Sequence, residues 1–165
     1  MSAVNSKLKT YRKKRDFTKT LEPFGKTRKK DTAIFVIQKH DASHLHYDLR
    51  LEIDGVLKSW AVPKGPPTKA GDKKLAMLTE DHPMEYAKFH GTIPEGEYGA
   101  GTVEIWDHGK YENLKEQDMS RCFKDGKIEI ILKGKKVKGK YALIKTKLSE
   151  GKGWLLLKMK ENGKD

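Results

Sequence analysis

The segment Leu45–Ile53 constrains the fold of this chain more than any other stretch. Its residues, LHYDLRLEI, alternate strictly between apolar and polar. Because successive side chains of a β-strand point to opposite faces, the apolar residues share one face and the polar residues share the other. The polar face carries imidazole, carboxylate and guanidinium groups instead of the Thr, Lys and Ser of an ordinary surface strand. The segment therefore predicts a strand with one core face and one chemically reactive face.

Further strand and turn signals follow at short intervals. Asp54-Gly55 is a two-residue hairpin signal, so segment 56–62 should pair with this strand. Apolar, β-branched and aromatic runs bounded by glycine or proline predict other strands near 32–38, 75–78, 102–106, 127–134, 140–147 and 154–160, with a turn at 107–110. Short helical segments are predicted near 84–88 and 118–123. About eight short strands with little helix predict a mainly β fold, a compact antiparallel β-barrel with a few short helices.

Positive charge is concentrated at the N-terminus. Residues 1–30 hold 11 Lys and Arg against 2 Asp and Glu, whereas residues 31–165 hold 24 against 21. The net charge of +12 favours a polyanionic partner, nucleic acid before an anionic membrane, with charge for solubility as the alternative. Taken by itself, the basic segment predicts a disordered arm.

The single cysteine, Cys122, excludes an internal disulfide and a cysteine-based zinc site. No histidine lies close to it in sequence, so we expect an inert, partly buried thiol in a reducing cytoplasm. No apolar run approaches the roughly 18 residues of a membrane span, and residues 1–30 lack the apolar block of a signal peptide. We therefore expect a cytoplasmic protein with no membrane partner.

Three side chains in and beside the alternating strand have the chemistry of metal ligands. His46 and Asp48 lie two residues apart, so they share the polar face with their Cα atoms about 6–7 Å apart. His40 would approach from the preceding segment, and this mixed nitrogen and oxygen set suits Mn²⁺, Zn²⁺ or Fe²⁺ better than Ca²⁺. Three protein ligands leave positions for water and substrate. The alternative is a set of solvated surface histidines, the interpretation that we favour for His44 alone.

Groups that could bind an anion lie nearby. Arg50 continues the polar face, where a guanidinium beside a metal can clamp phosphate or carboxylate; its alternative role is a salt bridge to Glu52 or Glu80. His82, in a proline-anchored turn, could be a metal ligand, a phosphate donor or a general acid, or a turn histidine bonded to local backbone. Tyr86 could reach the same place, although a lone tyrosine more often serves in packing.

Three blocks of the sequence are distinctive enough to compare with a known family. They read QKHDASHLHYDLRLEIDGVLKSWAVPKGP, LTEDHPMEY and GTIPEGEYGAGTVEIWDHGKYE. They resemble the 3′-phosphoesterase domain found in bacterial DNA ligase D and as free-standing archaeal and bacterial proteins. The resemblance implies a compact β-barrel and a Mn²⁺-dependent enzyme of end-joining repair, with Zn²⁺ or Co²⁺ as alternative metals. Such an enzyme removes a 3′-terminal ribonucleoside and then hydrolyses the remaining 3′-phosphate to a 3′-OH.

The resemblance also implies roles for individual residues. The positions that match the metal ligands are His40, His46 and Asp48. Arg50 and His82 match groups that hold the scissile phosphate, and Tyr86 matches a residue that supports activity. The positions that match a functionally required N-terminal motif are Arg15, Asp16 and Glu22. Gln38 and Lys64 lie in matching blocks and are expected to contact the substrate or support the groups that do.

The resulting expectation is an arm over residues 1–30, partly docked on the domain from about Arg15, and a single phosphoesterase β-barrel over residues 31–165. We expect a prokaryotic, nucleoid-associated monomer that acts on duplex or primer–template 3′ ends. Polymerase and ligase domains do not fit in 165 residues, so this chain should act alone or recruit them as separate proteins.

Two other function classes share parts of this pattern. A non-haem iron oxygenase also uses His-x-Asp with a distant histidine on a β-barrel, and Arg50 could then bind a 2-oxo acid. A non-catalytic nucleic-acid-binding barrel could use the same ligands for a structural metal. If the chain is a phosphoesterase, we expect direct attack by water, because no serine or cysteine presents itself as a nucleophile.

Overall fold

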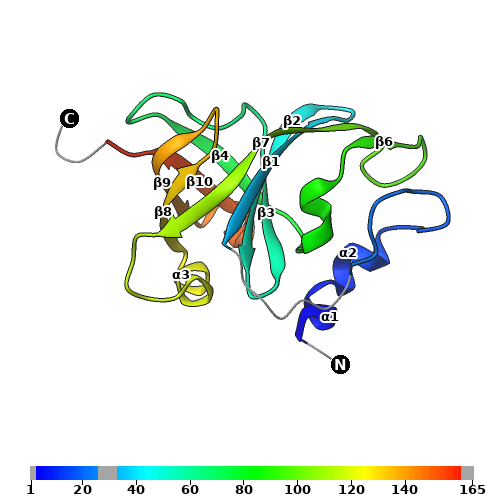
Figure 1. Ribbon diagram of the computed structural model, residues 1–165, viewed down its shortest axis with the longest axis horizontal. Coiled ribbons are helices and arrows are strands. Elements are labelled where there is room, and N and C mark those ends of the chain that lie inside the picture. Colours follow the sequence, from blue (N-terminus) through cyan, green and yellow to red (C-terminus); the bar gives the residue numbers. More distant parts are fainter. Residues whose placement is uncertain (1–2, 26–32, 161–165) are drawn as a thin grey trace.

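The strand predicted at 45–53 is present with the same bounds as β2 (Leu45–Ile53) in the computed structural model, which describes residues 3–25 and 33–160 (Figure 1). Asp54 and Gly55 follow with φ of 54° and 79°. Positive φ at both central residues characterises the tight turn whose twist matches that of two paired strands. The chain therefore returns directly as β3 (Val56–Val62), antiparallel to β2.

Eight strands close into a barrel. Besides β2 and β3, the strands are β1 (Ile34–Asp41), β4 (Lys73–Leu78), β5 (His82–Pro83), β6 (Gly91–Ile93), β7 (Gly101–Asn113), β8 (Lys127–Lys133), β9 (Lys138–Lys145) and β10 (Gly153–Lys158). The eight barrel strands pair in the order β1-β2-β3-β4-β10-β9-β8-β7, and β7 also pairs with β1, which closes the barrel. Strand β5 joins β3, and β6 joins β7. The predicted mainly β fold, an antiparallel barrel with few helices, is confirmed.

The helical segments are short. They are α1 (Ala3–Lys7), α2 (Lys9–Lys13), α3 (Met119–Asp125) and the 3₁₀ helices η1 (Met84–Lys88) and η2 (Leu148–Gly151). Asp118 caps α3 by accepting a hydrogen bond from the backbone N–H of Arg121. The helical segments predicted near 84–88 and 118–123 are thus present. In the described part of the chain, no helix has the length and apolar character that a bilayer crossing requires.

The barrel interior is apolar. Leu49, Leu51 and Ile53 of β2 point inward and are at most 2% exposed. Trp60 and Trp154 meet edge to face, with ring centroids 5.3 Å apart. Each large side chain that leaves water here contributes about 1.5–3 kcal/mol to stability. This burial fixes the register of β2, because a shift by one residue would move its polar side chains into the core.

The outward, polar face of β2 is buried as well. Asp48, Arg50 and Glu52 are 5%, 3% and 2% exposed. The ring of Tyr86 in η1 lies over the Arg50 guanidinium, 4.8 Å from centroid to Cζ. In Figure 1, η1 and the N-terminal helices lie beside the barrel at the side of β3 and β6. The polar face is therefore the floor of an enclosed site, not a solvated surface.

The N-terminal arm packs against the barrel. Val4, Leu8 and Tyr11 are buried, and Val4 and Leu8 cluster with Val56 of β3. Burial thus begins closer to the N-terminus than Arg15, where the sequence suggests that docking starts. The apolar residues recur at intervals of four and three, which places them on one side of a helical segment. This spacing is difficult to recognise in the sequence, because polar and basic residues separate the three apolar ones.

The turn predicted at 107–110 is wrong, because β7 continues through it. Asp107 accepts hydrogen bonds from the backbone N–H groups of Lys135, Lys136 and Val137 at 2.8–3.0 Å. Its carboxylate therefore stabilises the turn between β8 and β9. Asp107, one of the polar residues that suggest a local turn, instead stabilises a turn that is distant in sequence.

Gly101 is required where β7 passes close to the end of β1. Its φ is +140°, and an added Cβ would lie 2.2 Å from the Asp41 carbonyl oxygen. Gly96 also has a positive φ, +88°, but open space around an added Cβ. We expect Gly101→Ala to lower the free energy of unfolding by about 2–3 kcal/mol and Gly96→Ala by about 1 kcal/mol, measured by urea titration. Equal losses would show that the close approach is unimportant.

Candidate active site

Strand register brings the three predicted metal ligands together. His40 of β1 lies opposite His46 of β2, and Asp48 follows two residues later on the same face of β2. Asp48 Oδ2 lies 3.5 Å from His40 Nδ1 and 3.2 Å from His46 Nε2. One ligand atom from each of the three residues lies within 4.8 Å of the other two. These side chains can therefore bind a single metal ion.

Backbone carbonyls orient both imidazoles. His40 Nε2 lies 2.7 Å from the Gly99 carbonyl oxygen, and His46 Nδ1 lies 3.0 Å from that of His44. Because a carbonyl oxygen only accepts, these two nitrogens carry hydrogen and donate. The other nitrogen of each neutral ring then presents its lone pair toward Asp48. A hydrogen bond of this kind commonly fixes the tautomer of a metal-binding histidine. The exposed side chain of His44 takes no part.

The electrostatics of this group favour a bound cation. Burial alone would raise the pKa of Asp48, but Arg50 and the two imidazoles hold it well below its usual range. When His46 is protonated, its Nε2–H can donate to Asp48, and this hydrogen bond raises the pKa of His46 against the opposing effect of burial. Two lone pairs and a carboxylate that converge on one point repel one another unless a cation lies between them. Two nitrogens and one oxygen form a donor set that fits a divalent transition metal.

Arg50 lies next to the ligands and keeps one donor unused. Its Nε donates to Gln38 Oε1 at 2.6 Å, and one terminal nitrogen lies 3.5 Å from Asp48 Oδ2. Gln38 donates in turn to the backbone carbonyls of Tyr86 and Phe89. Gln38 is fully buried and therefore orients Arg50 from behind. The other terminal nitrogen of Arg50, Nη1, is buried and has no hydrogen-bond partner among the described residues.

His82 of β5 is a neutral imidazole with an accepting Nε2. Its Nδ1–H donates to the Glu80 carbonyl oxygen at 3.0 Å. Its Nε2 lies 3.4 Å from a terminal nitrogen of Arg15, which can only donate. Burial, followed by the positive charges of Arg50 and Arg15, holds the pKa of His82 well below its usual value. His82 can therefore accept a proton at Nε2 before it can donate one.

The N-terminal arm supplies another wall of the site. Arg15 Nε donates to Glu22 Oε2 at 2.9 Å, and its Nη1 lies 3.4 Å from Glu80 Oε2. The Tyr86 hydroxyl also donates to Glu22 Oε2, at 2.8 Å. Glu22 is 4% exposed, so this carboxylate ties the arm to η1. Glu80, which the sequence suggests as a partner of Arg50, pairs with Arg15 instead.

These side chains surround one cavity of about 360 Å³. Its lining consists of Arg15, Glu22, His40, Ala42, Ser43, His46, Asp48, Arg50, Ala61, Thr79, Glu80, His82, Tyr86, Ile93, Tyr98 and Gly99. The structure thus unites the predicted metal ligands with the predicted phosphate-binding groups and with part of the N-terminal motif. The lining residues come from the arm, from five strands (β1, β2, β3, β5 and β6), from η1 and from three loops, so their proximity depends on the closed fold.

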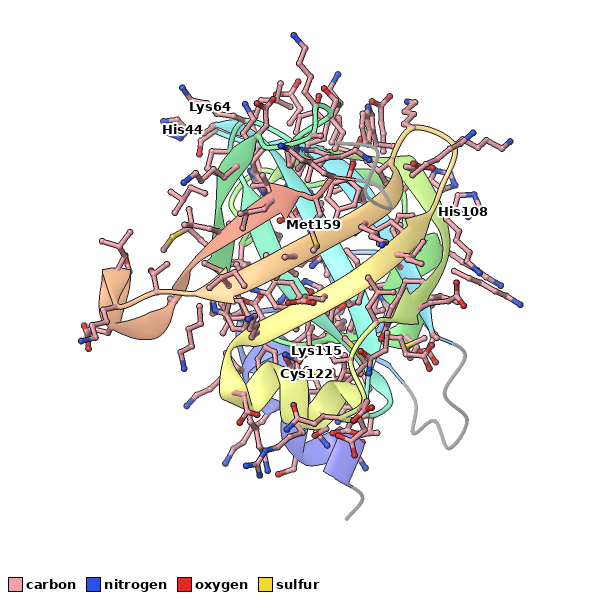
Figure 2. The ribbon with its side chains drawn as sticks, turned by 90° about the vertical axis from the view of Figure 1, so that its left-hand side faces the viewer. His44, Lys64, His108, Lys115, Cys122 and Met159 are labelled. Carbon is pink, nitrogen blue, oxygen red and sulfur yellow. The ribbon has the colours of Figure 1, made fainter. Side chains whose placement is uncertain are left out.

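Some predicted residues lie elsewhere, and others were missed. Lys64 is exposed at the end of the barrel opposite α3 and does not line the cavity (Figure 2). Asp16 is exposed and closes a turn by accepting from the Thr18 N–H and hydroxyl at 3.0 and 2.6 Å. Tyr98 and Gly99 line the cavity from a glycine-rich loop whose sequence lacks the features of a phosphate-binding loop, so motif reasoning does not find them.

Replacing the hydroxyl of Tyr86 should separate its hydrogen bond from its ring. Tyr86→Phe keeps the ring over Arg50 but removes the hydrogen bond to Glu22. We expect the free energy of unfolding to fall by about 1.5–3 kcal/mol, the usual contribution of a hydrogen bond to a charged group, as measured by chemical denaturation. Tyr141→Phe is a matched control, since its buried hydroxyl donates to the neutral Pro67 carbonyl and should cost about 1 kcal/mol. Equal losses would contradict a special role for Glu22.

His82 should make the stability of the protein sensitive to acid. Its folded pKa lies below the ordinary value of 6.5, so the unfolded chain binds more protons below that pH. Acidification below pH 6.5 should therefore destabilise the wild type by up to about 1.4 kcal/mol per pH unit relative to His82→Asn. Denaturation of both proteins between pH 8 and 5 measures this difference. A difference that stays constant with pH would mean that His82 is not held neutral.

Most of this chain is similar in sequence to known proteins. The family model of the DNA ligase D 3′-phosphoesterase domain matches residues 38–145. The chain is 51% identical over 164 residues to the multifunctional non-homologous end joining protein LigD of Mycolicibacterium smegmatis and 47% identical over 158 residues to that of Pseudomonas aeruginosa. It is 48% identical over 164 residues to the corresponding DNA repair protein LigD of Mycobacterium tuberculosis. These alignments cover 96%, 93% and 98% of the chain but 21%, 19% and 21% of the relatives, about a fifth of their length.

Proposed function

This chain belongs to the family of DNA ligase D 3′-phosphoesterase domains, and on that premise we propose that it is a Mn²⁺-dependent hydrolase that heals the 3′ ends of DNA. It removes a 3′-terminal ribonucleoside from a DNA or primer–template end and leaves a 3′-phosphate. It then hydrolyses that phosphate to a 3′-OH for end-joining repair. Membership in the family argues against the iron oxygenase, which shares the histidine and aspartate pattern on a β-barrel but not the family's sequence blocks.

The unused donor of Arg50 is the observation that carries this proposal. Burying a guanidinium nitrogen without a partner is costly, and Arg50 lines a cavity large enough for a phosphate group. Because Nη1 is itself buried, a small turn of the guanidinium toward the cavity would let a phosphate oxygen accept a charge-assisted hydrogen bond from it. The three ligands adjoin the same guanidinium through Asp48. A metal and an arginine can thus reach one anion.

The metal-binding group fits the proposed cofactor. His40 Nδ1, His46 Nε2 and Asp48 Oδ2 are the atoms that would hold Mn²⁺, and the donor set also suits Zn²⁺ or Co²⁺. When bound, the ion supplies Lewis-acid chemistry, polarising a phosphate oxygen and lowering the pKa of a coordinated water. The hydrogen bonds from the imidazoles to Gly99 and His44 keep the ligand nitrogens turned inward.

The remaining side chains position the phosphate and manage a proton. Arg50 holds the phosphate oxygens, while Gln38 and Asp48 prevent the guanidinium from turning away. A phosphate entering the cavity adds negative charge, which favours the protonated form of His82. His82 therefore gains a proton at Nε2 on substrate binding and then donates it to a phosphate oxygen or to the leaving oxygen. The leaving oxygen is the 5′ oxygen of the ribonucleoside in the first step and the 3′ oxygen of the primer in the second. Arg15 lies beside Nε2 and stabilises the same anion.

Other proteins would use the product of this reaction. The printed names of the relatives assign them to non-homologous end joining. A DNA polymerase and a DNA ligase both require a 3′-OH, so we expect this chain to act before them, at DNA ends in the cytoplasm near the nucleoid. We infer that it is a monomer, because one chain supplies the complete set of site residues.

A time course with one substrate tests the proposed function. A primer–template that ends in a single 3′ ribonucleotide is incubated with Mn²⁺, and the primer products are resolved by electrophoresis. We expect a 3′-phosphate product that converts to 3′-OH, loss of both steps with EDTA, and recovery when Mn²⁺ is added in excess. Oxygen-dependent turnover of a 2-oxo acid with Fe²⁺, without cleavage of the primer, would overturn the proposal.

A further inference from the structure

A second hollow, which we term the lysine groove, adjoins the active-site cavity. Its volume is about 460 Å³. It is lined by Lys7, Thr10, Lys14, Lys58, Leu78, Thr79, Glu80, Asp81, Tyr98, Phe123 and Lys152. These residues come from the arm, from β3, from the end of β4 and the segment that follows it, from the loop before β7, from α3 and from the segment before β10. The hollow therefore lies outside the barrel, toward its α3 end.

The lysine groove is positively charged. Among its lining residues, four lysines face two carboxylates. Lys14 lies 3.1 Å from Glu80, and Lys58 lies 2.9 Å from Asp81. Asp81 also interacts electrostatically with Lys7, and Glu80 also pairs with Arg15. The four lysines of the lining still outnumber its two carboxylates, so the groove keeps a net positive charge. A ligand with repeated negative charges matches this surface.

The groove is continuous with the active site. Thr79, Glu80 and Tyr98 line both hollows. Tyr98 is 49% exposed, with Lys14 Nζ 4.7 Å and Arg15 Cζ 5.4 Å from the centre of its ring. An exposed aromatic ring beside a positively charged groove is the combination that proteins use to follow a nucleic-acid strand.

We propose that the lysine groove is the track for the DNA strand whose 3′ end enters the active site. This proposal rests on the proposed function and adds a direction to it. The terminal phosphate lies at Arg50, the terminal nucleotide packs against Tyr98, and the phosphates on its 5′ side lie along the groove against Lys7 and Lys152. Contacts to the backbone make this binding independent of sequence and sensitive to salt.

A different basic surface is a weaker candidate for the track. Lys64, Lys69 and Lys73 lie in or beside the loop between β3 and β4, and Lys64 is at the end of the barrel opposite α3 (Figure 2). None of these three lysines lines the active-site cavity or the lysine groove. A DNA strand whose 3′ end lies in the cavity would have to extend beyond both hollows before it could contact these three lysines.

Hydrolysis of long and short substrates by matched variants tests the track. The long substrate is a 3′-phosphorylated primer of 12 nucleotides on a template, and the short one is a dinucleotide with a 3′-phosphate. The double variant Lys7→Ala/Lys152→Ala should raise KM for the long substrate about tenfold, leave its kcat within about twofold, and leave the dinucleotide unaffected. The slope of log Kd against log salt concentration for the primer should become shallower by about 1.5–2.

Two further variants complete the design. Lys135→Ala/Lys138→Ala removes the same charge from the turn after β8 and from the first residue of β9. Neither lysine lines either hollow, so this pair should match the wild type. Tyr98→Ala should raise KM for both substrates, whereas Tyr98→Phe, which keeps the ring, should not. The glutamine pair Lys7→Gln/Lys152→Gln repeats the test if the alanine pair fails to fold.

The outcomes separate the two levels of inference. If the wild type hydrolyses neither substrate with Mn²⁺, the proposed function fails. If it hydrolyses both but the groove variants match the control pair on the long primer, the track is wrong and the proposed function stands. Equal losses on the primer and the dinucleotide would likewise overturn the track, because the short substrate does not reach the groove lysines.

Discussion

Arg50→Lys should lower kcat/KM for a 3′-phosphate end by about 10²–10³-fold, the usual effect of removing one donor to a transition-state oxyanion. Arg50 has three side-chain nitrogens, of which one bonds Gln38, one lies beside Asp48 and one is left for the substrate. Lysine keeps the positive charge, but its single nitrogen cannot serve all three positions. The fold should survive, because the lysine keeps an apolar stem and a positive charge beneath the Tyr86 ring. Steady-state hydrolysis and circular dichroism of the purified variant measure the two effects separately.

A second arginine provides the control for this change. Arg121 of α3 is exposed and pairs with Asp125 at 3.2 Å, and it does not line the active-site cavity. Arg121→Lys should leave kcat/KM within about twofold of wild type. If Arg50→Lys also kept activity within a few-fold, the unused nitrogen of Arg50 would not be the anion-binding group, and the main support for the proposed function would be lost.

Asp48→Asn should abolish most metal binding and hydrolysis with little change in shape. The amide removes the negative charge that faces His40 and His46, so the site loses its one charged ligand. We expect Mn²⁺ affinity to fall at least about 100-fold, measured by calorimetric titration, and hydrolysis to fall about 10³-fold because the Lewis-acid contribution is several kcal/mol. Arg50 also loses its buried ionic partner, so we expect a loss of up to about 3–5 kcal/mol in stability.

Asp107→Asn is the matched control, because Asp107 is also a buried carboxylate. It accepts from backbone N–H groups of the turn between β8 and β9 and does not line the cavity. This variant should lose stability but bind Mn²⁺ like the wild type. Unchanged Mn²⁺ affinity in Asp48→Asn would show that the metal site lies elsewhere. Equal Mn²⁺ losses in both variants would attribute the effect to general destabilisation.

The parts of the site that could be predicted share a short stretch of one strand. His46, Asp48 and Arg50 follow one another at intervals of two, and the pleat alone places them on one face. The bounds of β2 are correct because the apolar residues of the other face must enter the core. His40 required the further assumption that its segment pairs with β2, and the register of β1 supports it.

Other parts of the site depend on contacts that no local pattern reports. Tyr98 and Gly99 reach the cavity because their loop folds back over His40, and Glu80 contributes through an ion pair with the distant Arg15. The tautomer of His82 likewise follows from the Glu80 carbonyl and the Arg15 guanidinium, which meet only in the folded chain. Sequence patterns describe neighbours along the chain, whereas these pairings join residues that are far apart in it.

The sequence by itself determined the alternation of β2, the barrel class, the positions of the predicted metal ligands and the resemblance that suggests their chemistry. Each of these depends on spacing within one element or on blocks of sequence that resemble one family. Tertiary structure decided that the polar face of β2 is buried, that the arm packs from Val4 onward as a wall of the site, and that the lysine groove continues the cavity. The physical reason is that burial and electrostatic environment are set by what packs against a residue, and in this barrel those neighbours come from the arm, η1 and loops remote in sequence.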